Sequence, residues 1–194
     1  MIAKATFIEL GHGGKTWYGG TDKGASFGGY SERDLLKPVA IELLRILRSK
    51  ISDGNVYDVG IYSNARSSKK AKYINSVVKE NWLDWNDCFA LSLHLNSSVN
   101  PASGIECWIP QQATLNGIEA KLAENLINRM NAYHYQRDRG IKQKRLYIND
   151  FAPNTVLIEC GFINDEKFLE YVLNEPERLA ESIANWYLTF LRDN

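Results

Sequence analysis

Three residues whose side chains could do chemistry lie in or just after short apolar runs that are typical of buried strands. His12 follows the first run and is flanked by glycines, His94 lies near the end of the second, and Glu159 lies within the third. The runs are Thr6–Leu10, Cys88–Asn96 and Thr155–Phe162. If these strands are parallel, their carboxyl ends meet at one edge of a sheet, where α/β sheets place their sites. Because zinc takes histidine nitrogen and carboxylate oxygen as ligands, the pattern indicates a metal site.

Each of these residues also has an interpretation without chemistry. Two histidines far apart in a sequence are more often buried and satisfied by hydrogen bonds than bound to a metal. A glutamate inside an apolar strand is harder to explain in this way, because acidic side chains are rarely buried without a partner. We expect His134, late in a helix, to be solvated. Glu106 is expected on the polar face of its strand rather than in contact with a substrate.

The segments that must position these residues alternate between strand and helix. Further strands are expected at Val56–Ser63, Ile105–Ile109 and, as a short one, Leu146–Ile148. Amphipathic helices are expected at Leu35–Ile51, Ser67–Leu83, Leu115–Tyr135 and Pro176–Leu191. This alternation predicts a single α/β domain, residues 1–194, with a twisted, mainly parallel central sheet of about six strands and helices on both faces.

Three local features refine this picture. Ser31 offers an N-cap with Asp34 three residues on, which places Glu32 at the beginning of the first long helix. The stretch Lys15–Tyr30 is rich in glycine and aromatic residues and is expected to be a long surface loop, which in a compact domain tends to be functional. The basic segment Arg137–Arg145 is expected to be a solvated loop.

Composition limits the partners. Lys+Arg and Asp+Glu both number 23, so the basic excess of a nucleic-acid-binding protein is missing. No apolar run is long enough to span a bilayer, and the first residues lack the apolar region of a secretory signal. We therefore expect a chain made in the cytoplasm without a signal peptide and not inserted in a membrane. We also expect a monomer. Cys88, Cys107 and Cys160 lie in apolar runs and imply no disulfide framework, and Cys160 is expected to face away from Glu159.

Five motifs in a fixed order carry a resemblance to a known family. They are Gly11-His12-Gly13-Gly14, Asp22-Lys23-Gly24-Ala25, Ser31-Glu32, Ser92-Leu93-His94-Leu95-Asn96 and Leu157-Ile158-Glu159-Cys160-Gly161-Phe162-Ile163-Asn164. In these motifs the chain resembles the zinc-dependent N-acetylmuramoyl-L-alanine amidases of cell division, phage lysins and spore-associated lysins. The segment Arg139-Gly140-Ile141-Lys142 also looks like a family motif. The resemblance runs from about Phe7 to the terminal helix.

The resemblance implies roles for four residues. His12, Glu32 and His94 would hold one Zn²⁺ ion, and Glu159 would be the catalytic carboxylate. The implied reaction is hydrolysis of the amide between N-acetylmuramic acid and the L-alanine that begins the stem peptide, so the partner is peptidoglycan. The residue types suit this chemistry, because zinc activates water and polarises a carbonyl while a carboxylate moves protons.

The sequence also departs from the family. Lys15–Thr21 is inserted after the first motif, with Trp17 and Tyr18 at the rim, and Pro110–Leu115 leaves no room for the inhibitory helix of cell-division members. No cell-wall-binding module is expected beside the catalytic domain, although the basic segment Arg137–Arg145 could meet peptidoglycan carboxylates. Without a signal, we expect a lysin that reaches the wall after release by a holin or by lysis. Two alternatives stay open, which are a catalytically inactive peptidoglycan-binding module and a zinc peptidase that cuts within the stem peptide.

Overall fold

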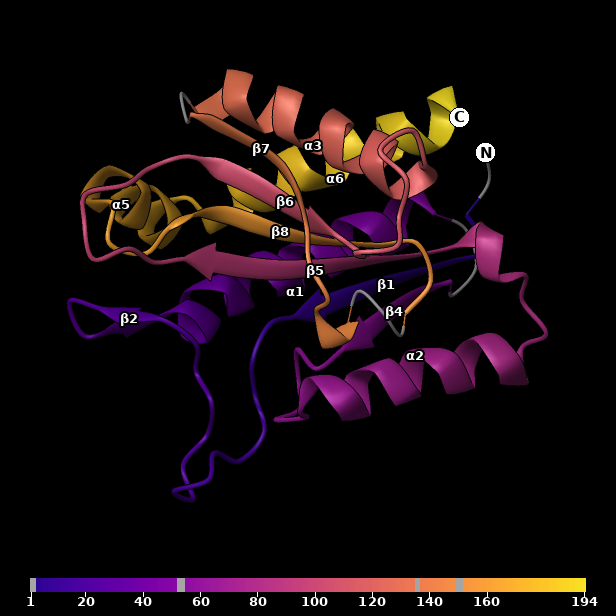
Figure 1. Cartoon of the computed structure of the whole chain (residues 1–194), viewed down its shortest axis with the longest axis horizontal. Coiled ribbons are helices and arrows are strands. Elements are labelled where there is room, and N and C mark those ends of the chain that lie inside the picture. Colours follow the sequence, from indigo (N-terminus) through magenta and orange to yellow (C-terminus); the bar gives the residue numbers. More distant parts are fainter. Residues whose placement is uncertain (1–2, 52–54, 135–136, 149–151) are drawn as a thin grey trace.

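The computed structural model describes residues 3–51, 55–134, 137–148 and 152–194, of which 131–134 are described by their backbone alone. Figure 1 shows a central sheet with helices on both sides. The sheet has six strands in the order β4-β1-β5-β8-β6-β7. The strands are β4 (Val56–Val59), β1 (Ala5–Leu10), β5 (Cys88–Asn96), β8 (Thr155–Phe162), β6 (Ile105–Ile109) and β7 (Asp138–Gln143).

The first four strands in this order run parallel to one another, while β6 pairs antiparallel with β8 and parallel with β7. The expected single α/β domain with a mainly parallel sheet is therefore confirmed. A separate two-stranded hairpin, β2 (Ser26–Phe27) and β3 (Tyr30–Ser31), lies within the segment that was expected to be a loop. A short 3₁₀ turn, η1 (Trp85–Asp87), leads into β5.

The helices cover the two faces unequally. One face carries α1 (Glu32–Lys50), α3 (Ile118–His134), α5 (Glu166–Asn174) and α6 (Pro176–Asp193), whose apolar side chains join the larger core. The other face carries α2 (Ser67–Glu80), which packs on β1 and β4 over a smaller core. Within the described ranges, no helix is both long and apolar enough to cross a bilayer.

Strand alternation decides which side chains can meet the site. In β5, Leu91, Leu93 and Leu95 enter the larger core. His94 alternates with them and therefore points to the α2 face. The same alternation in β8 sends Ile158 and Cys160 into the larger core. Glu159 therefore lies on the α2 face with His94, and Cys160 faces away from it as expected.

The start of α1 is built as its sequence indicates. Ser31 is the N-cap, with extended backbone, and its hydroxyl accepts a hydrogen bond from the Asp34 backbone N–H. Glu32 is consequently fixed as the first helical residue, one step from the cap. Pro38 lies inside this helix, which continues through it to Lys50.

Several expectations need correction. The segment Arg137–Arg145 is not a solvated loop, because Asp138–Gln143 forms β7 and its basic side chains pair with the buried carboxylate of Glu106. The strand expected at Leu146–Ile148 is wrong, since Tyr147 and Ile148 are helical and Ile148 packs in the smaller core.

Other differences concern boundaries and missed elements. The strand expected at Val56–Ser63 ends at Val59, where Gly60 adopts a φ of +89°. Helix α5 was not expected, although Asp165 caps it by accepting a hydrogen bond from the Lys167 backbone N–H. The side chain of His134 lies outside the described part of the structure, so its expected exposure stays a prediction.

Candidate metal centre

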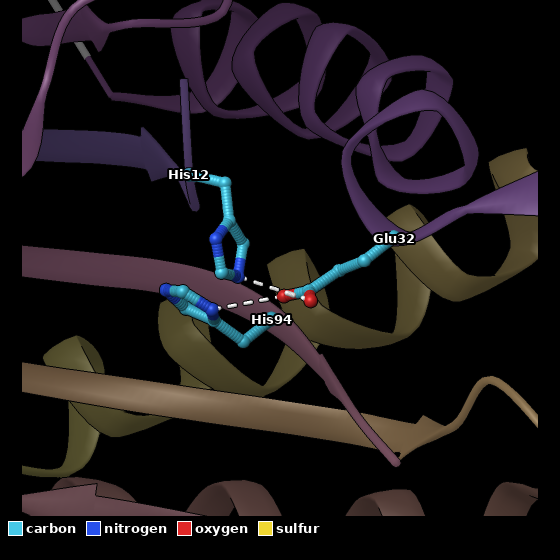
Figure 2. A group of neighbouring side chains, drawn as sticks. All are labelled: His12, Glu32 and His94. Atoms are coloured by element: carbon cyan, nitrogen blue, oxygen red, sulfur yellow. Dashed lines mark hydrogen bonds and ion pairs between the residues drawn. The ribbon is translucent and has the colours of Figure 1, made fainter. Parts of the chain in front are cut away.

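His12, Glu32 and His94 come together at the carboxyl end of the parallel strands, as Figure 2 shows. His12 Nε2 lies 3.0 Å from Glu32 Oε2, and His94 Nδ1 lies 2.9 Å from Glu32 Oε1. One ligand atom from each residue lies within 4.8 Å of the others. Three elements supply the group, which are the end of β1, the first turn of α1 and β5.

The glycines around His12 allow this approach. His12 itself adopts a left-handed φ of 60°, which is uncommon for a residue with a side chain. A Cβ at Gly11 would lie 2.5 Å from the His94 ring, and one at Gly24 would lie 2.3 Å from Glu32 Oε2 and 2.5 Å from the His12 ring. Glycine at these two positions therefore gives the three ligand side chains the space to meet.

Two buried cations fix the backbone that carries His12. Arg33 donates hydrogen bonds to the carbonyl oxygens of Gly11 (2.9 Å) and Gly60 (2.6 Å), among others. Lys70 on α2 pairs with Glu9 at 2.6 Å and also donates to the carbonyl oxygens of Leu10 and His12. Hydrogen bonds from charged donors to buried carbonyl oxygens are among the stronger ones, so the two cations stabilise the turn after β1.

Further hydrogen bonds orient the ligands. Glu32 accepts from the backbone N–H groups of Leu95 and Ala25, each at 3.0 Å, so both carboxylate oxygens are held in place. His12 Nδ1 lies 3.1 Å from Asp22 Oδ2, on the side of the ring away from Glu32. A carboxylate behind a ligating imidazole fixes its tautomer and raises its basicity. Sequence reasoning placed Asp22 in a motif but gave it no role.

The charges in this group stabilise one another. Burial alone would lower the pKa of His12, but the hydrogen bonds and negative charges of Glu32 and Asp22 outweigh it and raise that pKa to about 9. Burial alone would raise the pKa of Glu32, but hydrogen bonds from His12 and His94 dominate and lower it to about 2. Against the effect of burial, the hydrogen bond to Glu32 also raises the pKa of His94. Negative charge at Glu32 thus favours cations on both sides of it, and a divalent cation would compete with protons for the same groups.

Glu159 is the neighbour of this group on β8. It is the register partner of His94, and its Oε2 is a buried oxygen without a hydrogen-bond partner in the described structure. Burial raises the pKa of Glu159 to about 7. A carboxylate in this state exchanges its proton near neutral pH, as a catalytic acid or base must.

The group opens onto a cleft of about 440 Å³ on the α2 face of the sheet. Its lining includes the four residues above together with Asn96, Glu106, Trp108, Lys144 and Leu157. Glu106 was expected on the polar face of its strand rather than at a substrate site, but it lines the cleft. It is buried, points into the cleft opposite Glu159 in the strand register, and pairs with Arg139 and Lys142.

The donor set fits a zinc ion by its chemistry. Two imidazoles and one carboxylate are a common ligand set of catalytic zinc, which keeps a further position for water or substrate. The unpartnered oxygen of Glu159 beside the group is suited to bind such a water, since a buried carboxylate oxygen needs a donor. An open cleft with these groups suits metal-assisted hydrolysis.

Comparison with known proteins agrees with this arrangement. A sequence model of the N-acetylmuramoyl-L-alanine amidase family matches residues 7–186, which is nearly the whole chain. The chain belongs to this family. No match was found among curated protein sequences.

Solved structures with similar folds include several such amidases. An N-acetylmuramoyl-L-alanine amidase from Clostridium difficile 630 shares 29% identity, with 100% of each chain covered and a TM-score of 0.79. The catalytic domain of CwlV, an amidase from Bacillus (Paenibacillus) polymyxa var. colistinus, shares 21% identity over 98% of this chain and 99% of that one, with a TM-score of 0.76. The catalytic domain of the CD27L endolysin, which targets Clostridia difficile, shares 22% identity over 96% and 97% of the two chains, with a TM-score of 0.70.

Proposed function

We propose that this chain is a zinc-dependent N-acetylmuramoyl-L-alanine amidase, in which His12, Glu32 and His94 hold the metal and Glu159 is the catalytic residue. The reaction is hydrolysis of the amide between N-acetylmuramic acid and L-alanine in peptidoglycan, the activity of the family to which the chain belongs. The observation that carries the proposal is the meeting of three ligand atoms within 4.8 Å beside a buried carboxylate oxygen without a partner.

The two carboxylates of the site have opposite properties, and this divides their roles. Glu32 has a pKa lowered to about 2, so it is anionic and suited to bind a cation. Glu159 has a pKa raised to about 7, so it can take up and release a proton near neutral pH. In many enzymes, two neighbouring titratable groups have different roles because their surroundings shift their pKa values in opposite directions.

The bound zinc would supply Lewis acidity, which polarises the amide carbonyl and makes a water more acidic. Glu159 accepts the proton of the attacking water and then donates it to the nitrogen of the departing L-alanine. The carboxylate is therefore deprotonated again at the end of the reaction. His12 and His94 orient the site, and Asp22 holds the His12 ring. The raised pKa of Glu159 matches both proton transfers.

Chelation tests the zinc dependence. We expect the chain, stripped with a chelator, to leave purified peptidoglycan turbid, and re-addition of Zn²⁺ at one ion per chain to restore clearing. Activity that survives complete removal of metal would overturn the proposal. Loss of clearing with no recovery on Zn²⁺, but recovery on another divalent cation, would overturn only the identity of the metal.

We also propose that the chain acts as a lysin and works as a monomer. The lysin role is supported by the similar fold of the CD27L endolysin catalytic domain. The monomer is supported by the metal site, whose three candidate ligands all come from one chain. A zinc peptidase and an inactive peptidoglycan-binding module stay as alternatives. Lysis of intact cells by added protein, together with a monomeric mass in solution, would support the proposal, and failure to lyse any susceptible cell wall would contradict it.

A further inference from the structure

Three cationic side chains gather around Glu106, which lines one wall of the cleft. Glu106 is a single buried carboxylate, and Arg139 Nε and Lys142 Nζ approach its Oε2 at 2.8 Å and 2.5 Å. Lys144 adds a third cation, with its Nζ 5.7 Å from the centre of the Trp108 ring. Lys144 lines the cleft itself, whereas Arg139 and Lys142 lie behind the lining and reach it through Glu106. Three positive charges against the one negative charge of Glu106 leave a net positive charge beside the cleft.

Glu106 carries one negative charge, which cannot balance three cations, and its acceptor positions are also occupied. Asn96 Nδ2 and Trp108 Nε1 donate to its Oε1, at 2.9 Å and 3.1 Å, while Arg139 and Lys142 donate to its Oε2. A carboxylate has about four acceptor sites, so these four donors saturate it. No described carboxylate lies within ion-pair distance of Lys144, which lines the cleft and is exposed.

Trp108 holds the two lysines at the cleft. The Nζ of Lys142 lies 5.2 Å and that of Lys144 lies 5.7 Å from the centre of the Trp108 ring, within the range of cation–π attraction. Trp108 itself lies in the cleft lining and pairs in register with Leu157 on β8 and Lys142 on β7. The aromatic ring thus limits the freedom of both ammonium groups on one wall.

The distance from the reacting group to this wall fits a short peptide. Neighbouring strands are about 4.8 Å apart, so β7 lies about 10 Å from the strand that carries Glu159. An extended peptide advances about 3.3–3.6 Å per residue, and a lysine side chain adds further reach. A group on the first two residues beyond the scissile amide would come within reach of Lys142 and Lys144.

We propose that Lys144 and Lys142, held against Trp108, form a binding site for a carboxylate on the stem peptide within about two residues of the scissile amide. The inference rests on the proposed function, because it takes the stem peptide to lie in this cleft. It makes the two lysines determinants of specificity. Glu106 positions Lys142 and does not touch the reacting atoms.

Binding of two dipeptides to the zinc-loaded chain tests the site without requiring turnover. L-Alanyl-D-glutamate γ-methylamide carries the α-carboxylate, and L-alanyl-D-isoglutamine γ-methylamide carries a carboxamide in its place. The γ-carboxyl group is blocked in both, so the α-group is the one difference between them. By isothermal titration we expect the acid to bind about three- to tenfold more tightly than the amide. Lys144→Gln should remove most of this preference and Lys144→Arg should keep it. Lys121→Gln, on the exposed side of α3 and away from the cleft, should leave it unchanged.

The outcomes separate this inference from the proposed function. The chain could cleave purified peptidoglycan and yet bind both dipeptides equally, or bind neither. That result would overturn the carboxylate site and leave the amidase activity supported. A preference that Lys144→Gln and Lys121→Gln reduce equally would also overturn the site, since it would reflect total charge. A preference that depends on Lys144, in a chain that does not cleave peptidoglycan, would support the site and overturn the amidase.

Discussion

His94 and Glu159 are direct register partners on the neighbouring parallel strands β5 and β8, and both side chains point to the face that carries α2. A candidate metal ligand and a candidate catalytic carboxylate are thereby fixed by the pairing of two buried strands. A slip of the register by one residue would send Glu159 into the larger core. The relative position of the two groups thus depends on the sheet and not on a loop.

The first prediction concerns Glu159. We expect Glu159→Gln to lower kcat by about 100- to 10,000-fold, because the amide cannot accept and return a proton. Zinc content, measured by elemental analysis, should stay at one ion per chain, since Glu159 is not among the three proposed ligands. A variant that keeps the wild-type rate would contradict the proposed role, and one that loses zinc would assign Glu159 to the ligands instead.

The second prediction concerns Gly24. A Cβ at this position would lie 2.3 Å from Glu32 Oε2 and 2.5 Å from the His12 ring, so Gly24→Ala should separate the ligands and weaken zinc binding by at least about tenfold. Gly19→Ala is the matched control, because Gly19 also has a positive φ of +88° but no heavy atom near the added Cβ. Equal zinc affinity in the two variants, measured by competition with a chelator, would contradict the steric argument.

The third prediction concerns Asp22, behind the His12 ring. Asp22→Asn should weaken zinc binding by about 10- to 100-fold, because the amide is a poorer acceptor for the Nδ1–H of His12. At saturating zinc, kcat should recover most of its value. Asp193→Asn, at the exposed end of α6, removes the same charge far from the site and should leave zinc affinity unchanged.

The fourth prediction concerns the pH dependence of the metal-free protein. The pKa of His12 is raised from 6.5 to about 9, so its pairing with Glu32 stabilises the fold fully below pH 6.5 and is lost as pH rises through 9. The pKa of Glu32 is lowered from 4.5 to about 2, so the same pairing is lost as pH falls from 4.5 through 2.

A comparison of thermal unfolding isolates this effect. The difference in Tm between the wild type and His12→Gln, both with chelator, should be largest between pH 4.5 and 6.5 and should vanish above about pH 9. A difference that grows as the pH rises from 6.5 to 9 would have the wrong sign for a histidine stabilised in its charged form.

The fifth prediction concerns the buried pair of Lys70 and Glu9, whose side chains are each 1% exposed. Lys70→Met should destabilise the fold by about 3–5 kcal/mol, because it leaves Glu9 charged and buried and removes donors from the carbonyls of Leu10 and His12. The double variant with Glu9→Gln should recover part of this loss. Chemical denaturation measures both, and a change below about 1 kcal/mol for Lys70→Met would contradict the argument.

Much of the fold could be predicted from local sequence. The bounds of β5, β6 and β8 agree with expectation because each is a mainly apolar run between polar or turn residues. The start of α1 followed from Ser31 and Asp34 as a capping pair. Strand β7 was missed because its residues are mostly charged or polar, and what stabilises them is Glu106, more than thirty residues away in the sequence.

The candidate site could be predicted only in part. His12, His94 and Glu159 were suggested by their places in or after strands, whereas Glu32 depended on the family resemblance. The anchoring of His12 by Arg33 and Lys70 could not be predicted, because it joins residues about 20 and 60 positions apart through backbone carbonyls. Such contacts have no local periodicity and become visible only in the folded chain.

The most direct test of the central claim is the mass of the products released from purified peptidoglycan by the zinc-loaded chain. We expect free stem peptides with an unblocked L-alanine amino group, and glycan strands whose N-acetylmuramic acid residues carry a free lactyl carboxylate. The same digest with Glu159→Gln should release neither. Fragments cut within the stem peptide would instead identify a peptidase, and intact peptidoglycan after incubation with the zinc-loaded wild type would contradict the proposed hydrolase.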